Sequence, residues 1–117
     1  AHYQATRKFV LSAANPFYAQ GSQSAGLTSP HAGAVNQFWP LATIMQALTS
    51  TDEAEIVSCL KTLRDTHAGT YFMHESVDVD NSENFTRPWF GWANSLFGEL
   101  ILHIDRQFPD MLKKSLI

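Results

Sequence analysis

The sequence lacks the features that mark several functional classes. It has one cysteine, Cys59, so a disulfide framework and a thiolate metal site are both excluded, and its apolar neighbours favour a buried, unreactive thiol. No apolar run approaches the roughly 20 residues that cross a bilayer, so we expect no membrane partner. Charged residues make up only 16% of the chain and Lys and Arg form no cluster, so nucleic acid is not an expected partner.

Several short catalytic motifs are also missing. There is no G-x-S-x-G elbow for a nucleophilic serine, and no G-K-[ST] phosphate loop. His74 and Glu75 begin an H-E-x-x-H zinc motif, but Asp78 stands where the second histidine belongs. The remaining histidines show no ligand spacing on one element, so the sequence predicts no metal site.

What the sequence does contain is typical of a folded globular chain, with 44% hydrophobic and 12% aromatic residues. Apolar spacings of three and four residues predict helices at about 3–14, 38–48, 50–67 and 88–108. Ser50 and Glu53 are the predicted capping box of the third helix. The fourth helix is apolar nearly all round and is therefore expected to be buried. We interpret the chain as all-α, with long loops at about 15–37 and 69–87.

Glu75 is the first candidate for chemistry, because it follows the apolar letters "YFM" in the second loop. We expect it to lie at the end of a helical layer and to face a cleft. A carboxylate in such a place serves as a general acid or base when a substrate proton or a water is within reach. The alternative is a structural carboxylate that caps the next segment or pairs with Arg87.

Aromatic and polar residues around the two loops form a second candidate group. Sugars present flat apolar C–H faces and rings of hydroxyls, so sites that hold them combine indoles with Asn, His, Arg and acidic groups. The candidate substrate-binding residues are His31, Trp39, His74, Arg87, Trp89 and Asn94. The alternative for each tryptophan is ordinary core packing. His103, one turn after Glu99, is expected to satisfy that acid on the helix.

Several long strings in the sequence resemble one known family. They are "SPHAG", "WPL", "QALTSTDEAEI", "CLKTLRDTHAGTYFMHES" and "NFTRPWFGWANSLFGELIL". Together they resemble the C-terminal portion of glycoside hydrolase family 125, the exo-acting α-1,6-mannosidases. The resemblance covers nearly the whole chain from about Arg7 to Ile104.

The resemblance implies a fold and a mechanism. The fold would be part of an (α/α)6 barrel of helical hairpins, with the active site formed by loops at one end. The reaction would be the hydrolysis of mannose-containing, N-glycan-type oligosaccharides with net inversion and without a metal or other cofactor. The general base of the family falls in "MHES" and is carried over to Glu75. The family's general acid, an aspartate further upstream, has no counterpart in this chain.

The chain is therefore expected to be a piece of a longer protein. Residues 1–117 would form the C-terminal part of a single hydrolase domain, and the N-terminal part of that domain would be its partner. Isolated, the chain is expected to lack turnover, because half of the carboxylate pair is missing. The competing interpretation is a non-catalytic α-helical module that binds glycans or another protein.

Overall fold

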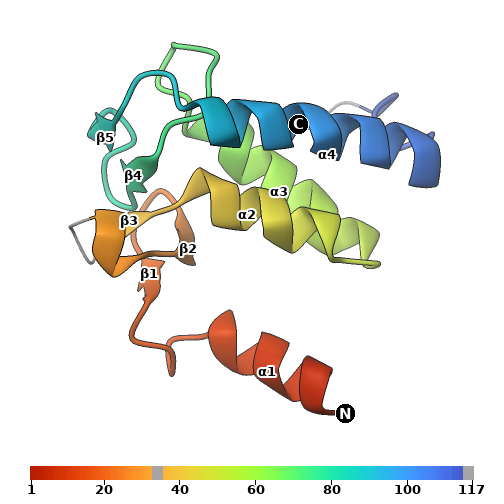
Figure 1. Cartoon of the computed structure of the whole chain (residues 1–117), viewed down its shortest axis with the longest axis horizontal. Helices are drawn as coiled ribbons and strands as arrows, with labels where there is room; N and C mark the ends of the chain where they lie inside the picture. The colour runs from red at the N-terminus through yellow and green to blue at the C-terminus, as the bar shows by residue number, and fades with distance from the viewer. Residues whose placement is uncertain (33–35, 115–117) are drawn as a thin grey trace.

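The computed structural model describes residues 1–32 and 36–114, and its helices and strands are shown in Figure 1. In chain order the elements are α1 (His2–Val10), β1 (Tyr18–Gln20), β2 (Ala25–Leu27), a 3-10 turn (Pro30–Ala32), β3 (Gln37–Phe38), α2 (Pro40–Leu48), α3 (Glu53–Asp65), β4 (Ser76–Asp78), β5 (Phe85–Thr86) and α4 (Gly91–Gln107). Helices α2, α3 and α4 correspond to three predicted helices, and α1 ends earlier than predicted.

The fold is mixed α/β, so the predicted all-α class, and with it the architecture of helical hairpins from an (α/α)6 barrel, is wrong. Two antiparallel sheets overturn it: β1 pairs with β2, and β3, β4 and β5 form a second sheet with β4 in the centre. The strands are only two or three residues long, which is too short for a clear two-residue alternation in the sequence.

The main core lies between α2, α3 and α4. Figure 1 shows α2 and α4 side by side, with α3 behind them. The side chains that fill this core are almost fully buried, and the largest are Ile44, Ile56, Leu63, Leu100 and Ile104. Within each helix, core residues lie three or four positions apart, as Ile44 and Ala47 do in α2 and Leu100 and Ile104 in α4, so the apolar stripes that predicted the helices are also the faces that pack.

The prediction that α4 is buried on all sides is wrong. Only Ala93, Leu100 and Ile104 of this helix are buried, whereas 74% of Trp92 and 56% of Leu102 are exposed. Within the described residues, α4 packs mainly against α2, so the opposite apolar side has nothing to cover it.

The predicted capping box of α3 does not form. The N-cap residue is Asp52, whose carboxylate accepts a hydrogen bond from the backbone N–H of Ala54 at 2.9 Å. The hydroxyl of Ser50 instead donates to Oε2 of Glu55 at 2.5 Å. Asp52 therefore caps the helix, and Ser50 is part of a polar network that connects the helices.

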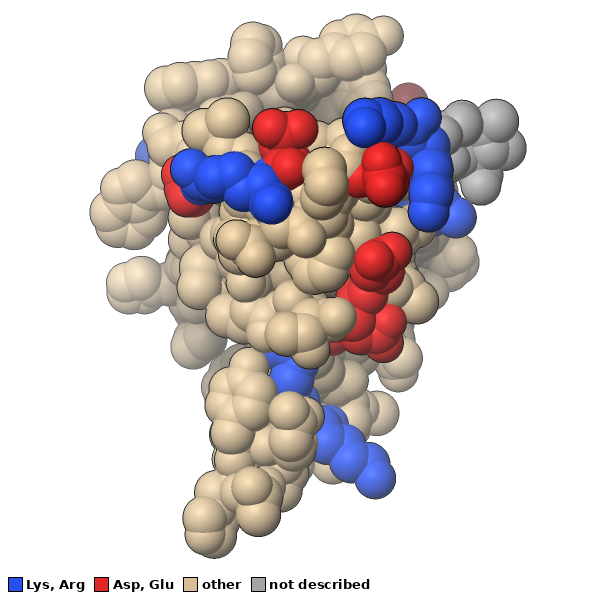
Figure 2. Space-filling view, turned by 90° about the vertical axis from the view of Figure 1, so that its right-hand side faces the viewer, with Lys and Arg blue, Asp and Glu red and all other residues tan. Residues whose placement is uncertain are grey.

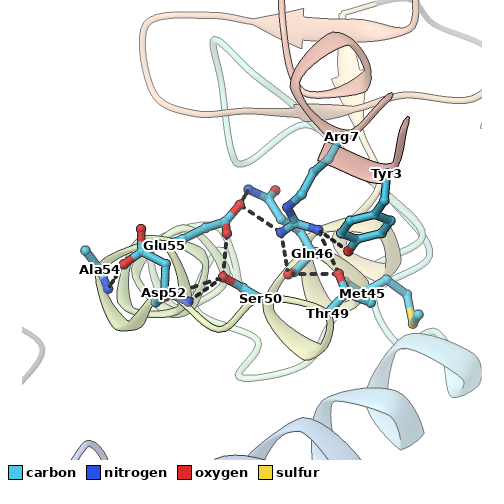
Figure 3. A network of polar contacts seen from close by, with 9 residues as sticks. All are labelled: Tyr3, Arg7, Met45, Gln46, Thr49, Ser50, Asp52, Ala54 and Glu55. Atoms are coloured by element: carbon cyan, nitrogen blue, oxygen red, sulfur yellow. Dashed lines mark hydrogen bonds and ion pairs between the residues drawn. The ribbon is translucent and has the colours of Figure 1, made fainter. Parts of the chain in front are cut away.

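That network holds α1 to the rest of the molecule, as Figure 3 shows. None of the residues of α1 is buried, and in Figure 1 the helix lies apart from the other three. The guanidinium of Arg7 donates to Oγ1 of Thr49 at 2.9 Å, to the carbonyl oxygen of Gln46 at 3.1 Å and to Oε1 of Glu55 at 2.9 Å. Polar contacts thus fix α1 where apolar packing does not.

The β1–β2 hairpin is fastened to the segment that follows β4. A Cβ at Gly21 would lie 2.5 Å from the carbonyl oxygen of Val79, so only glycine allows this close approach. The backbone N–H of Ser22 donates to Oδ1 of Asp80 at 2.7 Å. The first loop is therefore ordered by contacts with the second loop.

The surface carries no concentrated charge on the face drawn in Figure 2. Blue and red groups lie interspersed there on a mostly uncharged surface. Within residues 1–32 and 36–114, no helix has the length and apolar character required to span a membrane.

Candidate active site

The three-stranded sheet brings three predicted site residues to one end. Phe38 of β3 lies opposite Val77 of β4, and the pairing is antiparallel, so Trp39 after β3 and Glu75 before β4 leave the sheet at the same end. Ser76 pairs with Thr86 in the antiparallel β4–β5 ladder, so Arg87, which follows β5, leaves at this end too. The sheet that the sequence did not predict is thus the element that gathers the candidate site.

Glu75 and Arg87 form an ion pair at this end of the sheet. Nε of Arg87 lies 2.5 Å from Oε2 of Glu75, and 66% of the arginine side chain but only 21% of the glutamate side chain is exposed. The guanidinium also lies over the ring of Phe90, 5.7 Å from its centroid. In the part of the chain that the structure describes, no donor other than Arg87 reaches the Glu75 carboxylate, which leaves lone pairs free for a water molecule.

His74 lies beneath this pair and is 1% exposed. Its Nδ1 is 3.1 Å from the carbonyl oxygen of Arg87, and its Nε2 is 3.1 Å from the carbonyl oxygen of His67. Both partners are carbonyl oxygens of the backbone, so the ring is held between two segments of main chain. The ring stacks on Phe85 with centroids 3.8 Å apart. The side chain therefore links the turn after α3 to the turn after β5 and presents no free polar atom to the surface.

Asn94 also binds backbone. Its Oδ1 accepts from the N–H of Met73 at 3.1 Å, and its Nδ2 donates to the carbonyl oxygens of Met73 at 3.0 Å and Phe90 at 2.8 Å. The first turn of α4 is in this way tied to the residue that lies two positions before Glu75.

On the other side of Glu75, Ser76 is fixed just as firmly. This residue is fully buried, and its hydroxyl lies 2.7 Å from Oε1 of Gln37 and 2.7 Å from Oγ1 of Thr86. The backbone on both sides of Glu75 is consequently held in place, while Arg87 is the one side-chain partner of its carboxylate in the described part of the chain.

Two exposed aromatic residues lie close to the ion pair in sequence. Trp89 is 60% exposed. Its six-membered ring lies beside Gly91: a Cβ added to that glycine would be 3.4 Å from the ring. Tyr71 is 82% exposed and stacks on His67. Trp89, close in sequence to both Arg87 and Phe90, is thus available to stack on a ligand.

The structure does not bring His31 or the indole of Trp39 into contact with this pair. His31 is exposed on the 3-10 turn, where its N–H donates to Oγ of Ser29 at 3.1 Å. The indole of Trp39 lines a cavity of about 450 Å³ between α1 and α2, together with Leu27 and Met45. Its Nε1 has no hydrogen-bond partner among residues 1–32 and 36–114.

Asp78, another carboxylate close to Glu75 in sequence, is engaged in its own loop. Its pKa is held below the ordinary value, first by the backbone N–H of Asp80 and then by the side-chain amides of Asn84 and Asn36. Oδ2 accepts from Asn36 at 3.2 Å and from Asn84 at 3.1 Å. A carboxyl group that is stabilised as the anion is poorly suited to donate a proton.

Other candidate groups have structural surroundings. Among the described residues, no three His, Cys, Asp or Glu side chains gather as metal ligands would. Burial raises the pKa of the Cys59 thiol to about 12, which leaves it protonated and unreactive at neutral pH. Glu99 pairs with Arg106, with Nη2 and Oε1 3.3 Å apart, instead of with His103 as predicted.

Sequence reasoning missed the roles of Phe85 and Phe90, on which His74 and Arg87 rest. A signal for the strand that precedes Phe85 exists in "SVDVD", where Val77 and Val79 alternate with polar residues and are both buried. Two alternations are too few to distinguish a strand from a loop.

Comparisons with known proteins converge on one family. The family model described as metal-independent alpha-mannosidase (GH125) matches residues 1–102. The chain is 51% identical over 114 residues to the Meiotically up-regulated gene 157 protein of Schizosaccharomyces pombe, which corresponds to 97% of this chain and 22% of that protein.

A similar solved structure comes from Streptococcus pneumoniae. It is a metal-independent α-mannosidase in a non-productive substrate complex with α-1,6-mannobiose. The TM-score is 0.83 and the sequence identity 43%, over 88% of this chain and 24% of that one. The chain therefore spans about a fifth to a quarter of the length of the proteins that it matches.

Proposed function

The chain belongs to the metal-independent α-mannosidases of glycoside hydrolase family 125, and we propose that it supplies the general-base side of an α-mannosidase active site. The observation that carries this proposal is the environment of Glu75. Its neighbours in the chain are held by hydrogen bonds, its carboxylate is partly buried, and its one side-chain partner is exposed.

In the proposed reaction, Glu75 accepts a proton from a water molecule as that water attacks the anomeric carbon. A general base must be fixed in position yet keep lone pairs free, and the Glu75 carboxylate meets both requirements. Arg87 binds only Oε2 through Nε, so it orients the carboxylate while the other oxygen remains free to hold the water. Attack by this water from the face opposite the leaving group gives inversion.

The general acid of this reaction comes from outside these 117 residues. In inverting enzymes the acid stands about 6.5 to 9.5 Å from the base, and its pKa is raised so that it holds a proton. Asp78 lies close to Glu75 in sequence, but its pKa is lowered, so it does not meet this requirement. The relatives are about four times as long as this chain, which gives ample sequence for the missing acid.

The proposed substrate is a terminal mannose in α-1,6 linkage, as in N-glycan-type oligosaccharides. The bound α-1,6-mannobiose of the pneumococcal relative supports this choice. Trp89 and Arg87 are suited to face the sugar, since the indole offers a flat apolar surface and the guanidinium offers N–H donors to hydroxyls.

The stereochemistry of the product tests the mechanism. The complete polypeptide that carries this sequence is given an α-1,6-linked mannoside, and the first-formed sugar is followed by proton NMR before it mutarotates. Inversion predicts β-mannose. If α-mannose is released first, the enzyme retains configuration and Glu75 is not an inverting base.

Substitution of the base tests the residue assignment. Glu75→Gln is nearly isosteric but cannot accept the proton, so kcat should fall by about 10² to 10⁴ while KM changes little. Glu83→Gln, an exposed acid in the same loop, is the matched control and should keep the parental kcat. If the parent binds mannosides but does not hydrolyse them, the chain belongs to a glycan-binding module instead.

A further inference from the structure

Asn94 lies in the first turn of α4, and both polar atoms of its carboxamide bond protein backbone. Oδ1 accepts one hydrogen bond, from Met73, and Nδ2 donates two, to Met73 and Phe90. Because an amide NH2 group has only two hydrogens, no donor capacity of this side chain remains for a ligand. A sugar hydroxyl could take a hydrogen bond from Asn94 only by breaking one of these contacts.

Met73 is the residue through which this clamp reaches the candidate base. Its side chain is 7% exposed in the main core, and its carbonyl oxygen accepts a further bond from the N–H of Phe90 at 3.1 Å. Only His74, which is itself buried and bonded to two carbonyl oxygens, separates Met73 from Glu75. A shift of the Met73 backbone would therefore pass directly to Glu75.

We propose that Asn94 is a positioning residue for Glu75 and does not bind the sugar, an inference that rests on the proposed role of Glu75 as general base. The carboxamide fixes the approach of the loop to the first turn of α4, and this sets the position of the carboxylate above His74. General-base catalysis depends on such placement, because a displacement of about 1 Å can cost on the order of 10²-fold in rate.

The test compares Asn94→Ala with Ile104→Val in the complete polypeptide. Ile104 lies on the same helix in the main core, far along it from Asn94, and its truncation lowers stability without touching the loop. For Asn94→Ala we expect kcat to fall about 10- to 100-fold with KM within about threefold of the parent. The control should keep the parental kcat per folded molecule.

A second substitution, Asn94→Asp, tests the two hydrogen bonds that Nδ2 donates. It keeps an oxygen for the N–H of Met73 but places the second carboxylate oxygen against the carbonyl oxygens of Met73 and Phe90. We expect a loss of kcat at least as large as with Asn94→Ala. In Asn94→Ala the amide of Met73 should exchange with deuterium about tenfold faster, as expected for one lost hydrogen bond, whereas Ile104→Val should not change it.

Two results for Asn94→Ala alone would overturn the inference. A raised KM with the parental kcat would mean that Asn94 contacts the sugar, and a parental kcat per folded molecule would mean that it is only structural. Combining Asn94→Ala with Glu75→Gln separates this inference from the proposed function. If Asn94 acts through Glu75, it has little further effect in the Glu75→Gln background, whereas multiplying losses contradict the inference. If Glu75→Gln alone retains activity, the proposed base has failed, and the catalytic role of Asn94 fails with it.

Discussion

Two of the arginine–glutamate pairs, Arg7–Glu55 and Arg87–Glu75, differ in how fully each carboxylate is used. Glu55 bonds Arg7 and Gln46 through Oε1, each at 2.9 Å, and Ser50 through Oε2. Among residues 1–32 and 36–114, Glu75 has one side-chain partner, Arg87, which lies at Oε2. Both glutamates are partly buried, with 24% and 21% of their side chains exposed. Burial alone therefore does not distinguish them.

The difference lies in what the remaining lone pairs can do. Both oxygens of Glu55 accept hydrogen bonds, from Arg7 on α1, from Gln46 on α2 and from Ser50 in the connection to α3, so most of the acceptor capacity of this carboxylate joins the three helices (Figure 3). Glu75 has an exposed partner, and in the described part of the chain its other oxygen has no donor, while the backbone on both sides is fixed. A carboxylate whose two oxygens both hold side chains supports the fold, and one with a free oxygen at a fixed place is suited to chemistry.

Removing the Glu55 carboxylate should produce the largest change in stability. Glu55→Ala leaves Arg7, Gln46 and Ser50 without their shared acceptor, so we expect the free energy of unfolding to fall by about 1 to 3 kcal/mol. Urea denaturation of the complete polypeptide measures it. Glu99→Ala, which breaks the exposed pair with Arg106, is the control and should change stability by less than about 0.5 kcal/mol. If the two substitutions change stability equally, the Glu55 network contributes no more to the fold than the exposed Glu99–Arg106 pair.

Acid should weaken the Glu55 network in a defined direction. Burial raises the pKa of Glu55, but the hydrogen bonds from Ser50, Gln46 and Arg7 together outweigh it, so the pKa in the folded protein is lowered. The resulting stability is fully present above about pH 4.3, the usual pKa of glutamate, and is lost as the pH falls through the lower value of the folded protein. Urea midpoints measured below pH 5 should drop more steeply for the parent than for Glu55→Gln. Parallel curves would contradict this account.

Removing the exposed arginine should have the smallest effect on stability. Arg87 is 66% exposed, and the backbone oxygen that His74 uses remains in Arg87→Ala, so we expect a change of less than about 0.5 kcal/mol. Arg7→Ala, measured in the same way, should cost clearly more because it removes bonds to Thr49, Gln46 and Glu55. A larger loss from Arg87→Ala would mean that its ion pair supports the fold.

The sequence predicted the parts of the fold that repeat over several turns. Three- and four-residue spacings located α2, α3 and α4, because the residues that set the spacing, such as Ile56 and Leu63, are the ones that pack. The strands were missed because Phe85 and Thr86, for example, form a strand of only two residues, whose pairing depends on distant segments. The exposure of Trp92 was missed because periodicity cannot tell how many neighbours cover a helix.

The candidate site was predicted in part. The resemblance singled out Glu75, and the alternative that it pairs with Arg87 was also foreseen from the residues; the two are not exclusive, since the pair uses one oxygen. The sequence named His74 and Asn94 as polar residues of the right kind but could not show that backbone carbonyls and N–H groups use their hydrogen-bonding capacity. That information exists only when the chain is folded.

The most direct test of the account compares Gln substitutions at the two glutamates in the complete polypeptide. The measurement is kcat per folded molecule on an α-1,6-linked mannoside, with the urea midpoint recorded for each variant. We predict that Glu75→Gln lowers kcat by about 10² to 10⁴ and keeps the parental midpoint, whereas Glu55→Gln lowers the midpoint and keeps kcat. A kcat for Glu75→Gln within tenfold of the parent would contradict the central claim that this carboxylate is the general base.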